Sequence, residues 1–298
     1  MKTIAISDWL AYAPFWAAKD ELKKLGVRFE PSTRRVSGLS NGQFKAAMLW
    51  NYQLAGLLNA VGDDFIVSWA FMEPVGLGAN RIIARSWIKS LEDLFNSRIG
   101  VCRDGVEQSL FEHMFFIANF EQKRDYVLLR DRTNYLTALR ESRIDAVLVP
   151  QPERSRIQKE IIGTEVFEEN GHLPHYGLYV ILVHRRSEWN FDELHEIQKI
   201  VSAKAAELEA LSDDDLRANY PGLFGGLEKP MQEVRSTLHW MSPHESTQYL
   251  LGDTENSFRE HLARIAAYRV ARFGSAPLDF DRITGLVAAG DVAEEIKG

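Results

Sequence analysis

The stretch RIGVCRDGVEQSLFEHMFFIAN, residues 98–119, decides the fold class of this chain. It opens with a short apolar strand at 98–101, turns at 102–105, and continues as an apolar helix from about 106 to 119. The same plan then repeats as a strand at 126–129, a helix near 135–141 and a strand at 144–149. Strands that alternate with helices predict a mostly parallel α/β sheet with helices on both faces.

The pattern extends toward both ends of the chain. Upstream, we expect strands at 1–7, 27–30 and 65–69, a helix that begins at Pro14, and a longer helix from about 43 to 61. The strand at 179–183 closes the alternating part, and the chain after about residue 187 is predominantly helical. Ser242 and Glu245 predict a capping box there. This helical tail is expected to pack on the first lobe.

Composition narrows the class of protein. The 298 residues are 45% hydrophobic and 26% charged, the balance of a soluble globular chain long enough for about two domains. A net charge of −7 without a basic tract argues against nucleic acid as the main partner. No apolar run approaches the roughly 20 residues of a membrane-spanning helix. The single cysteine excludes an intrachain disulfide and a cysteine-rich metal site.

Five segments in this order resemble one known family. They are DWLAYAPFWAAK (8–19), GDDFIVS (62–68), IKSLEDL (88–94) followed by RIGV (98–101), IDAVLVPQP (144–152) and YGLYVILV (176–183). Together they are similar to the type II periplasmic-binding-protein fold, and within it to the nitrate, sulfonate, taurine and thiamine-pyrimidine solute-binding family. The resemblance covers about residues 3–190 and depends on the order of the patterns.

The resemblance implies a two-lobed type II periplasmic-binding-protein-like α/β fold with a helical C-terminal extension. Residues 1–98 and 186–298 would form lobe I with the C-terminal helices, and residues 99–185 would form lobe II. The ligand is expected in a cleft between the lobes, at the carboxyl ends of strands and the amino ends of helices.

Aromatic residues in the expected lobe I loops are the first candidates for ligand contact. Trp9 and Tyr12 follow the first strand, and Trp69 follows a later one. Their rings can stack on a planar ligand or wall one side of it, or can equally pack against neighbouring helices. Trp50 and Asn51 offer the same two interpretations, and Trp50 fits a core position better.

The turn that follows the strand at 98–101 is the most informative candidate. Arg103, Asp104, Gly105 and Val106 place the start of a helix at the expected cleft, where free backbone amides favour an anion. Arg103 can clamp a carboxylate, sulfonate or phosphate, or it can be solvated while Asp104 caps the helix. Cys102 lies just before this turn: it is a nucleophile if the protein is an enzyme, and otherwise a small buried hydrophobic residue.

The remaining candidates come from other loops. Asn80 and Arg81 can contribute a carboxylate-binding arginine from lobe I, and Gln151 can hydrogen-bond a polar ligand edge. His175 and Tyr176 lie in the loop before the return strand. His172 and His175 flank a proline and have no third ligand with suitable spacing, so no metal site is expected. No cofactor is expected either, because no Walker loop, dinucleotide fingerprint or nucleophile elbow is present.

The resemblance implies a solute-binding protein, and the candidate residues favour a small planar or anionic organic ligand that it clamps, such as a heteroaromatic compound, a sulfonate or a carboxylate. The alternative is a cytoplasmic enzyme on the same fold, resembling a desulfinase or an enzyme of pyrimidine or menaquinone formation. Two departures weaken it: the iron-binding cysteine string of the pyrimidine synthases is missing, and Cys102 lies later than the desulfinase cysteine. A sensory binding module is a third possibility.

The first residues of the sequence bear on the cellular location of the protein. No export signal precedes the first strand, which predicts a cytoplasmic protein, or a periplasmic one if this is a mature form. The expected partners are a small organic ligand and, for an exported form, an ABC permease.

Overall fold

The computed structural model describes residues 1–7, 10–32, 34–51, 53–54, 57, 65–74, 81–102, 107–118, 120, 125–130, 134–149, 153–167, 179–185, 188–254 and 257–273. The chain forms two compact units. Unit 1 comprises Met1–Pro74 and Gly177–Gly298, and unit 2 comprises Val75–Tyr176. Each unit is built around its own mixed sheet.

The sheet of unit 1 has six strands in the order β11-β4-β10-β3-β1-β2. Their bounds are β1 Lys2–Ile6, β2 Val27–Pro31, β3 Ala46–Trp50, β4 Phe65–Pro74, β10 Val180–Arg185 and β11 Leu238–Trp240. β1 is parallel to β2 and β3, whereas β10 runs antiparallel to β3 and β4, and β11 runs antiparallel to β4. β3 and β4 therefore point the same way as β1.

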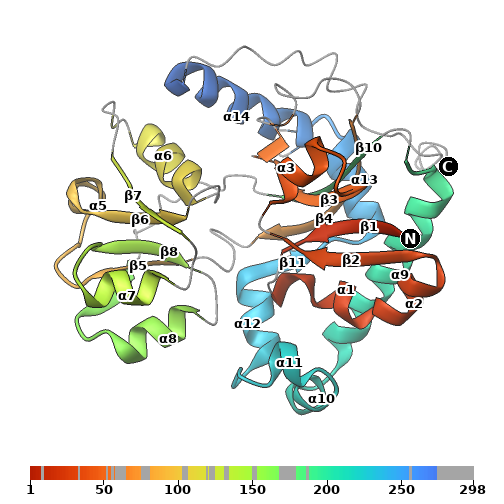
Figure 1. The fold of residues 1–298 in the computed structure, drawn as a ribbon, viewed down its shortest axis with the longest axis horizontal. Helices are drawn as coiled ribbons and strands as arrows, with labels where there is room; N and C mark the ends of the chain where they lie inside the picture. Colours follow the sequence, from red (N-terminus) through yellow and green to blue (C-terminus); the bar gives the residue numbers. More distant parts are fainter. Residues whose placement is uncertain are drawn as a thin grey trace. The chain divides into compact units, whose positions relative to one another are not determined.

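Helices flank this sheet on both sides. Their bounds are η1 Leu10–Tyr12, α1 Ala13–Ala17, α2 Lys19–Lys24, α3 Arg35–Ser40, α9 Phe191–Ala210, α10 Asp213–Asn219, α11 Pro221–Phe224, α12 Pro230–Thr237, α13 Pro243–Leu251 and α14 Phe258–Phe273. Figure 1 shows α3 and α14 on one side of the sheet and α1, α10, α11 and α12 on the other. The predicted helical tail therefore belongs to unit 1.

Local signals fixed several helix starts as predicted. Pro14 lies in the first turn of α1, and the Ser242–Glu245 capping box at α13 is complete, with both reciprocal hydrogen bonds present. Gly26 follows the end of α2 at a φ of 74°, a conformation that glycine adopts without strain.

An aromatic cluster forms the core between β4 and α1. The ring centroid of Phe71 lies 5.3 Å from that of Trp69, 5.1 Å from that of Phe15 and 5.9 Å from that of Tyr12. All four side chains are at most 2% exposed. Edge-to-face and offset arrangements of this kind stabilise a core beyond the apolar area that they bury.

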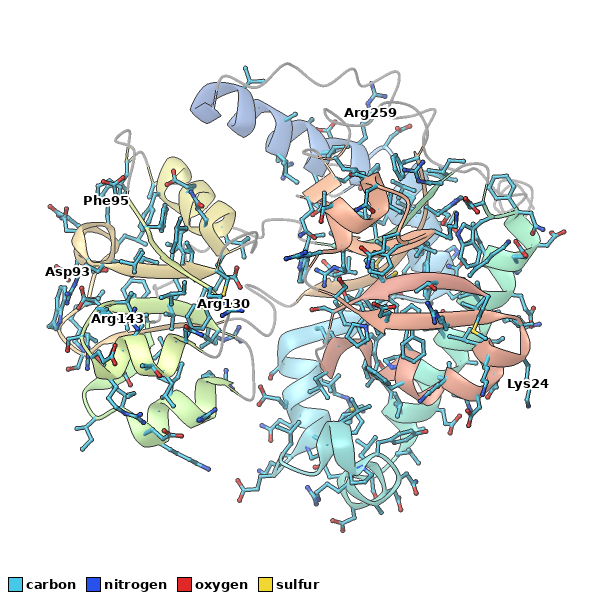
Figure 2. All side chains as sticks on the ribbon, in the orientation of Figure 1. Lys24, Asp93, Phe95, Arg130, Arg143 and Arg259 are labelled. Atoms are coloured by element: carbon cyan, nitrogen blue, oxygen red, sulfur yellow. The ribbon has the colours of Figure 1, made fainter. Side chains whose placement is uncertain are left out.

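The sheet of unit 2 has five strands in the order β7-β6-β8-β5-β9. The strands are β5 Arg81–Arg85, β6 Ile99–Cys102, β7 Val127–Leu129, β8 Ala146–Val149 and β9 Thr164–Phe167, and the helices are α5 Leu91–Asn96, α6 Glu107–Ile117, α7 Asn134–Arg140 and α8 Glu153–Glu160. β6 is parallel to β7 and β8, and β5 is antiparallel to β8 and β9. Phe95 of α5, labelled in Figure 2, lies 5.1 Å from the ring of Phe115 of α6.

The α/β class, the two-unit organisation and the helical C-terminal part agree with the sequence analysis. One predicted element is wrong: within the expected helix at 43–61, Ala46–Trp50 form strand β3. These five residues are all buried, because β3 lies between β1 and β10 in the interior of the sheet. A strand that is buried on both faces loses the alternation that would identify it.

The division between units also lies elsewhere than at the predicted residues 98/99 and 185/186. The chain crosses after Pro74 and returns after Tyr176. β5 pairs with β8 and β9, so residues 81–85 belong to unit 2, and β10 pairs with β3 and β4, so residues 180–185 belong to unit 1.

Candidate functional site

The edge of the unit 1 sheet at which β1, β3 and β4 end collects polar residues from distant parts of the chain. β10 begins at this edge, because Val180 lies opposite both Trp50 of β3 and Met72 of β4. Asn51, Glu73 and Tyr179 are their immediate neighbours in sequence and therefore lie side by side. In α/β sheets the carboxyl ends of parallel strands are the usual place for a ligand.

Hydrogen bonds connect these three residues directly. The Tyr179 hydroxyl donates to Glu73 Oε1 at 2.8 Å. The backbone N–H of Asn51 donates to the carbonyl oxygen of Tyr179 at 2.9 Å, which fixes the entry of β10 against the exit of β3. Asn51 itself is fully buried, and its side-chain Nδ2 donates to the hydroxyl of Tyr249 on α13 at 3.2 Å.

Two rings from the C-terminal helices complete the arrangement. The Tyr249 ring stacks on the Tyr179 ring with centroids 3.7 Å apart and an interplanar angle of 16°. His261 of α14 lies 5.4 Å from the Tyr179 ring, and its Nδ1 is 3.4 Å from the Tyr249 hydroxyl. We call Asn51, Glu73, Tyr179, Tyr249 and His261 the edge cluster.

A β-bulge in β4 accompanies the contact between β4 and α13 beside this cluster. The register between β10 and β4 shifts between Val180 and Ile181. The backbone N–H of Ala70 on β4 donates to the Ser246 hydroxyl of α13 at 2.9 Å. A helix side chain thus satisfies a strand amide, as a buried donor requires.

Burial sets the protonation of the cluster. It raises the pKa of Tyr249 well above its ordinary value, although the hydrogen bond from Asn51 opposes this effect. Burial and the bond to Glu73 likewise raise the pKa of Tyr179. Burial, assisted by the charge of Arg264, lowers the pKa of His261 to about 4. Near pH 7 both tyrosines are therefore protonated and His261 is neutral.

The lowered pKa of His261 predicts a pH-dependent stability. Its ordinary value is 6.5, so between pH 6.5 and 4 the unfolded chain binds a proton that the folded chain does not. The contribution of neutral His261 to the free energy of unfolding is fully present above pH 6.5 and is lost as the pH falls toward 4. The loss is roughly 2 kcal/mol after allowance for solvent screening. Urea denaturation at several pH values measures it.

The matched variants are His261→Gln and His195→Gln. The first should flatten this part of the pH profile, since glutamine does not titrate. The second replaces an exposed histidine on α9 and should leave the profile unchanged. An identical slope in His261→Gln and the unchanged protein would contradict the assignment.

The candidates from the sequence lie in different places. Tyr12 and Trp69 belong to the aromatic core, and Trp50 is also buried. Arg81 is the first residue of β5 and so belongs to unit 2 rather than to lobe I. Cys102 ends β6, and its Sγ donates to the Tyr135 hydroxyl at 3.2 Å. Trp9, Asn80, Arg103, Asp104, Gly105, Val106, Gln151, His175 and Tyr176 lie outside the described residues.

Sequence reasoning missed four members of the edge cluster and weighed only Asn51. Glu73 and Tyr179 had a usable signal, because each adjoins a strand end. Tyr249 and His261 had none, since they lie on helices far along the chain and reach the cluster only through tertiary packing.

No protein-family model matches the sequence, and no curated protein sequence matches it. Solved structures do match. The alkanesulfonate-binding protein SsuA from Xanthomonas axonopodis pv. citri, bound to MOPS, has a TM-score of 0.65 at 13% identity, with 96% of this chain and 97% of that chain covered. SsuA from Escherichia coli gives 0.65 at 13% identity, over 94% and 90% of the two chains.

A third structure extends the likeness beyond sulfonate binders. The Candida albicans CA3427 gene product, described as defining a new family with the generic periplasmic binding protein structural fold, has a TM-score of 0.70 at 10% identity, over 98% of this chain and 99% of that chain. At such identities the likeness concerns the fold. The chain has the type II periplasmic-binding-protein fold found in the SsuA sulfonate-binding proteins.

Proposed function

We propose that this chain is a solute-binding protein that binds a small organic ligand, with the edge cluster as part of its ligand site in unit 1. The observation that carries the proposal is the joint placement of Asn51, Glu73 and Tyr179 where β3 and β4 end. Solute-binding proteins of the same fold, such as the SsuA structures, support the same role.

The protonation of the cluster favours binding over proton transfer. A general acid or base works best with a pKa near the working pH. The pKa of His261 lies at about 4 and those of Tyr179 and Tyr249 lie above their ordinary value, so none of the three titrates near pH 7. Such groups hold a fixed pattern of hydrogen bonds, which suits recognition.

The ligand and partners predicted from the sequence remain part of the proposal. The anion-binding role of Arg103 stays a prediction from the sequence. For an exported protein, the proposed partner is the permease of an ABC importer. A structure described as the ligand-binding component of an ABC-type import system, from Staphylococcus aureus, has a TM-score of 0.65 at 13% identity.

No described helix combines the length and apolarity needed to cross a membrane.

Native mass spectrometry of freshly purified protein, beside its denatured mass, tests the proposal. A solute-binding protein should carry an excess mass that denaturation releases, and that mass should stay constant during incubation. A retained molecule that changes mass with time would instead indicate turnover and favour the enzyme. A bare protein mass, together with no response in a thermal-shift screen of anions, cations and heterocycles, would contradict solute binding.

Cys102→Ser separates the binder from the cysteine-dependent enzyme. Serine keeps a hydrogen-bonding group beside Tyr135 but is a much weaker nucleophile than a thiolate. We expect the variant to retain the same ligand mass, with an affinity within about twofold of the unchanged protein. Loss of a conversion that the unchanged protein performs would contradict this expectation and identify Cys102 as catalytic.

A further inference from the structure

Glu73 has a hydrogen-bond partner, but no cationic partner, within the described residues. It lies near the end of β4 and is half-buried. Its Oε1 accepts a hydrogen bond from the Tyr179 hydroxyl, a neutral donor. Within the described residues no lysine, arginine or histidine forms an ion pair with it. By contrast, the nearly buried Asp145 of unit 2 has Arg98 as its cationic partner.

The flanking strands do not supply the missing positive charge. His239 of β11 lies opposite Glu73 in the register, so the two side chains share a face of the sheet. However, His239 directs its Nε2 to Glu245 Oε1 of α13, at 3.0 Å. Glu73 is thus flanked by protonated Tyr179, just before β10, and by His239 of β11, which is already hydrogen-bonded to another carboxylate.

Tyr179 also leaves one carboxylate oxygen available. Stacking on Tyr249 and the hydrogen bond from Asn51 to its carbonyl hold Tyr179 in place. Its hydroxyl occupies only Oε1 of Glu73, and Oε2 has no hydrogen-bond partner within the described part of the chain. Because Glu73 is only partly buried, Oε2 can accept a hydrogen bond from a cationic group that reaches it.

We propose that Glu73 is the counter-ion for an organic cation, a protonated amine or an amidinium, which donates hydrogen bonds to Oε2. The inference rests on the proposed solute-binding function and concerns only the ligand group that lies against unit 1.

The experiment uses the full chain and two matched pairs of probes, benzamidinium with benzoate and cyclohexylammonium with cyclohexanecarboxylate. Within each pair the size and shape are similar and the charge is opposite. Isothermal titration calorimetry compares the unchanged protein with Glu73→Gln, which retains an acceptor for Tyr179. The control is Glu188→Gln, since Glu188 is already paired with Lys45 in the same unit.

We expect at least one cation of the two pairs to bind more tightly than its anionic counterpart. Glu73→Gln should lower the affinity for that cation about tenfold or more, and Glu188→Gln should leave this affinity unchanged. The assignment would be overturned by any of three results: Glu73→Gln binds the cation as tightly as the unchanged protein, the anion is preferred in both pairs, or no cation binds at concentrations up to the order of 10 mM.

The same probes distinguish this inference from the proposed function. If native mass spectrometry shows a retained ligand without a basic nitrogen, and neither cation binds, Glu73 is not a counter-ion but solute binding stands. If no molecule co-purifies, no probe binds and the thermal-shift screen gives no response, both proposals fail.

Discussion

Replacing Asp145 by alanine should destabilise unit 2 by about 2–3 kcal/mol. The carboxylate accepts three hydrogen bonds from Arg98: from its backbone N–H at 3.0 Å, and from Nε and Nη2 at 2.7 Å each. Burial raises the pKa of Asp145, but these bonds and the charges of Arg98 and Arg85 outweigh it, so the pKa lies below its ordinary value. The pair joins the start of β6 to the start of β8.

This expected loss of stability is smaller than that for breaking a fully buried ion pair, because the Arg98 side chain is 55% exposed and can return to water. Hydrogen exchange followed by mass spectrometry should show faster exchange in β6 and β8, without change in unit 1. The matched control is Glu141→Ala, which removes a carboxylate paired with Arg143 on the surface of the same unit. That variant should change stability by less than about 1 kcal/mol. Equal effects of the two variants would show that the Asp145 pair is no stronger than a surface pair.

The sequence carried the information for most elements of the fold because their signals are local. A proline in the first helical turn lacks an N–H that would otherwise be unpaired, and the Ser242–Glu245 box satisfies backbone N–H groups within three residues. Such signals do not depend on the rest of the molecule. They predicted the starts of α1 and α13 correctly.

β3 was mistaken for a helix because its signal is not local. The run Ala46–Trp50 is apolar throughout, and only its place between β1 and β10 makes it a strand. The unit boundaries failed for a related reason. Whether β5 and β10 belong to one sheet or the other depends on which strands they pair with, and pairing partners are distant in sequence.

The edge cluster depends even more on tertiary structure. Asn51 and Tyr249 are separated by 198 positions in the chain, and they meet only because α13 packs beside β4. The sequence pattern predicted the end of this strand at residue 69, whereas β4 runs to Pro74, and no pattern indicates that Tyr179 will hold the carboxylate of Glu73. Residues that a pattern marks as aromatic beside a strand, such as Trp69, are equally suited to a core.

Trp69 provides the sharpest test of that distinction, because its predicted ligand role and its observed packing lead to different results. It is 2% exposed, and its ring centroid lies 5.8 Å from that of Phe15 and 5.3 Å from that of Phe71. Trp69→Ala should destabilise unit 1 by about 3–5 kcal/mol, since a cavity remains where the indole was. Urea denaturation monitored by circular dichroism measures this change.

Trp69→Phe separates core packing from ligand contact. The indole N–H is buried and has no hydrogen-bond acceptor within the described residues, so phenylalanine removes an unsatisfied donor while keeping an aromatic ring. We therefore expect this variant to lose less than about half as much stability as Trp69→Ala, and to bind the co-purified ligand with unchanged affinity. An affinity loss of about tenfold in a stably folded Trp69→Phe would instead show that the indole donates to the ligand. That result would confirm the role predicted from the sequence and would move the ligand site from the edge cluster toward the aromatic core between β4 and α1.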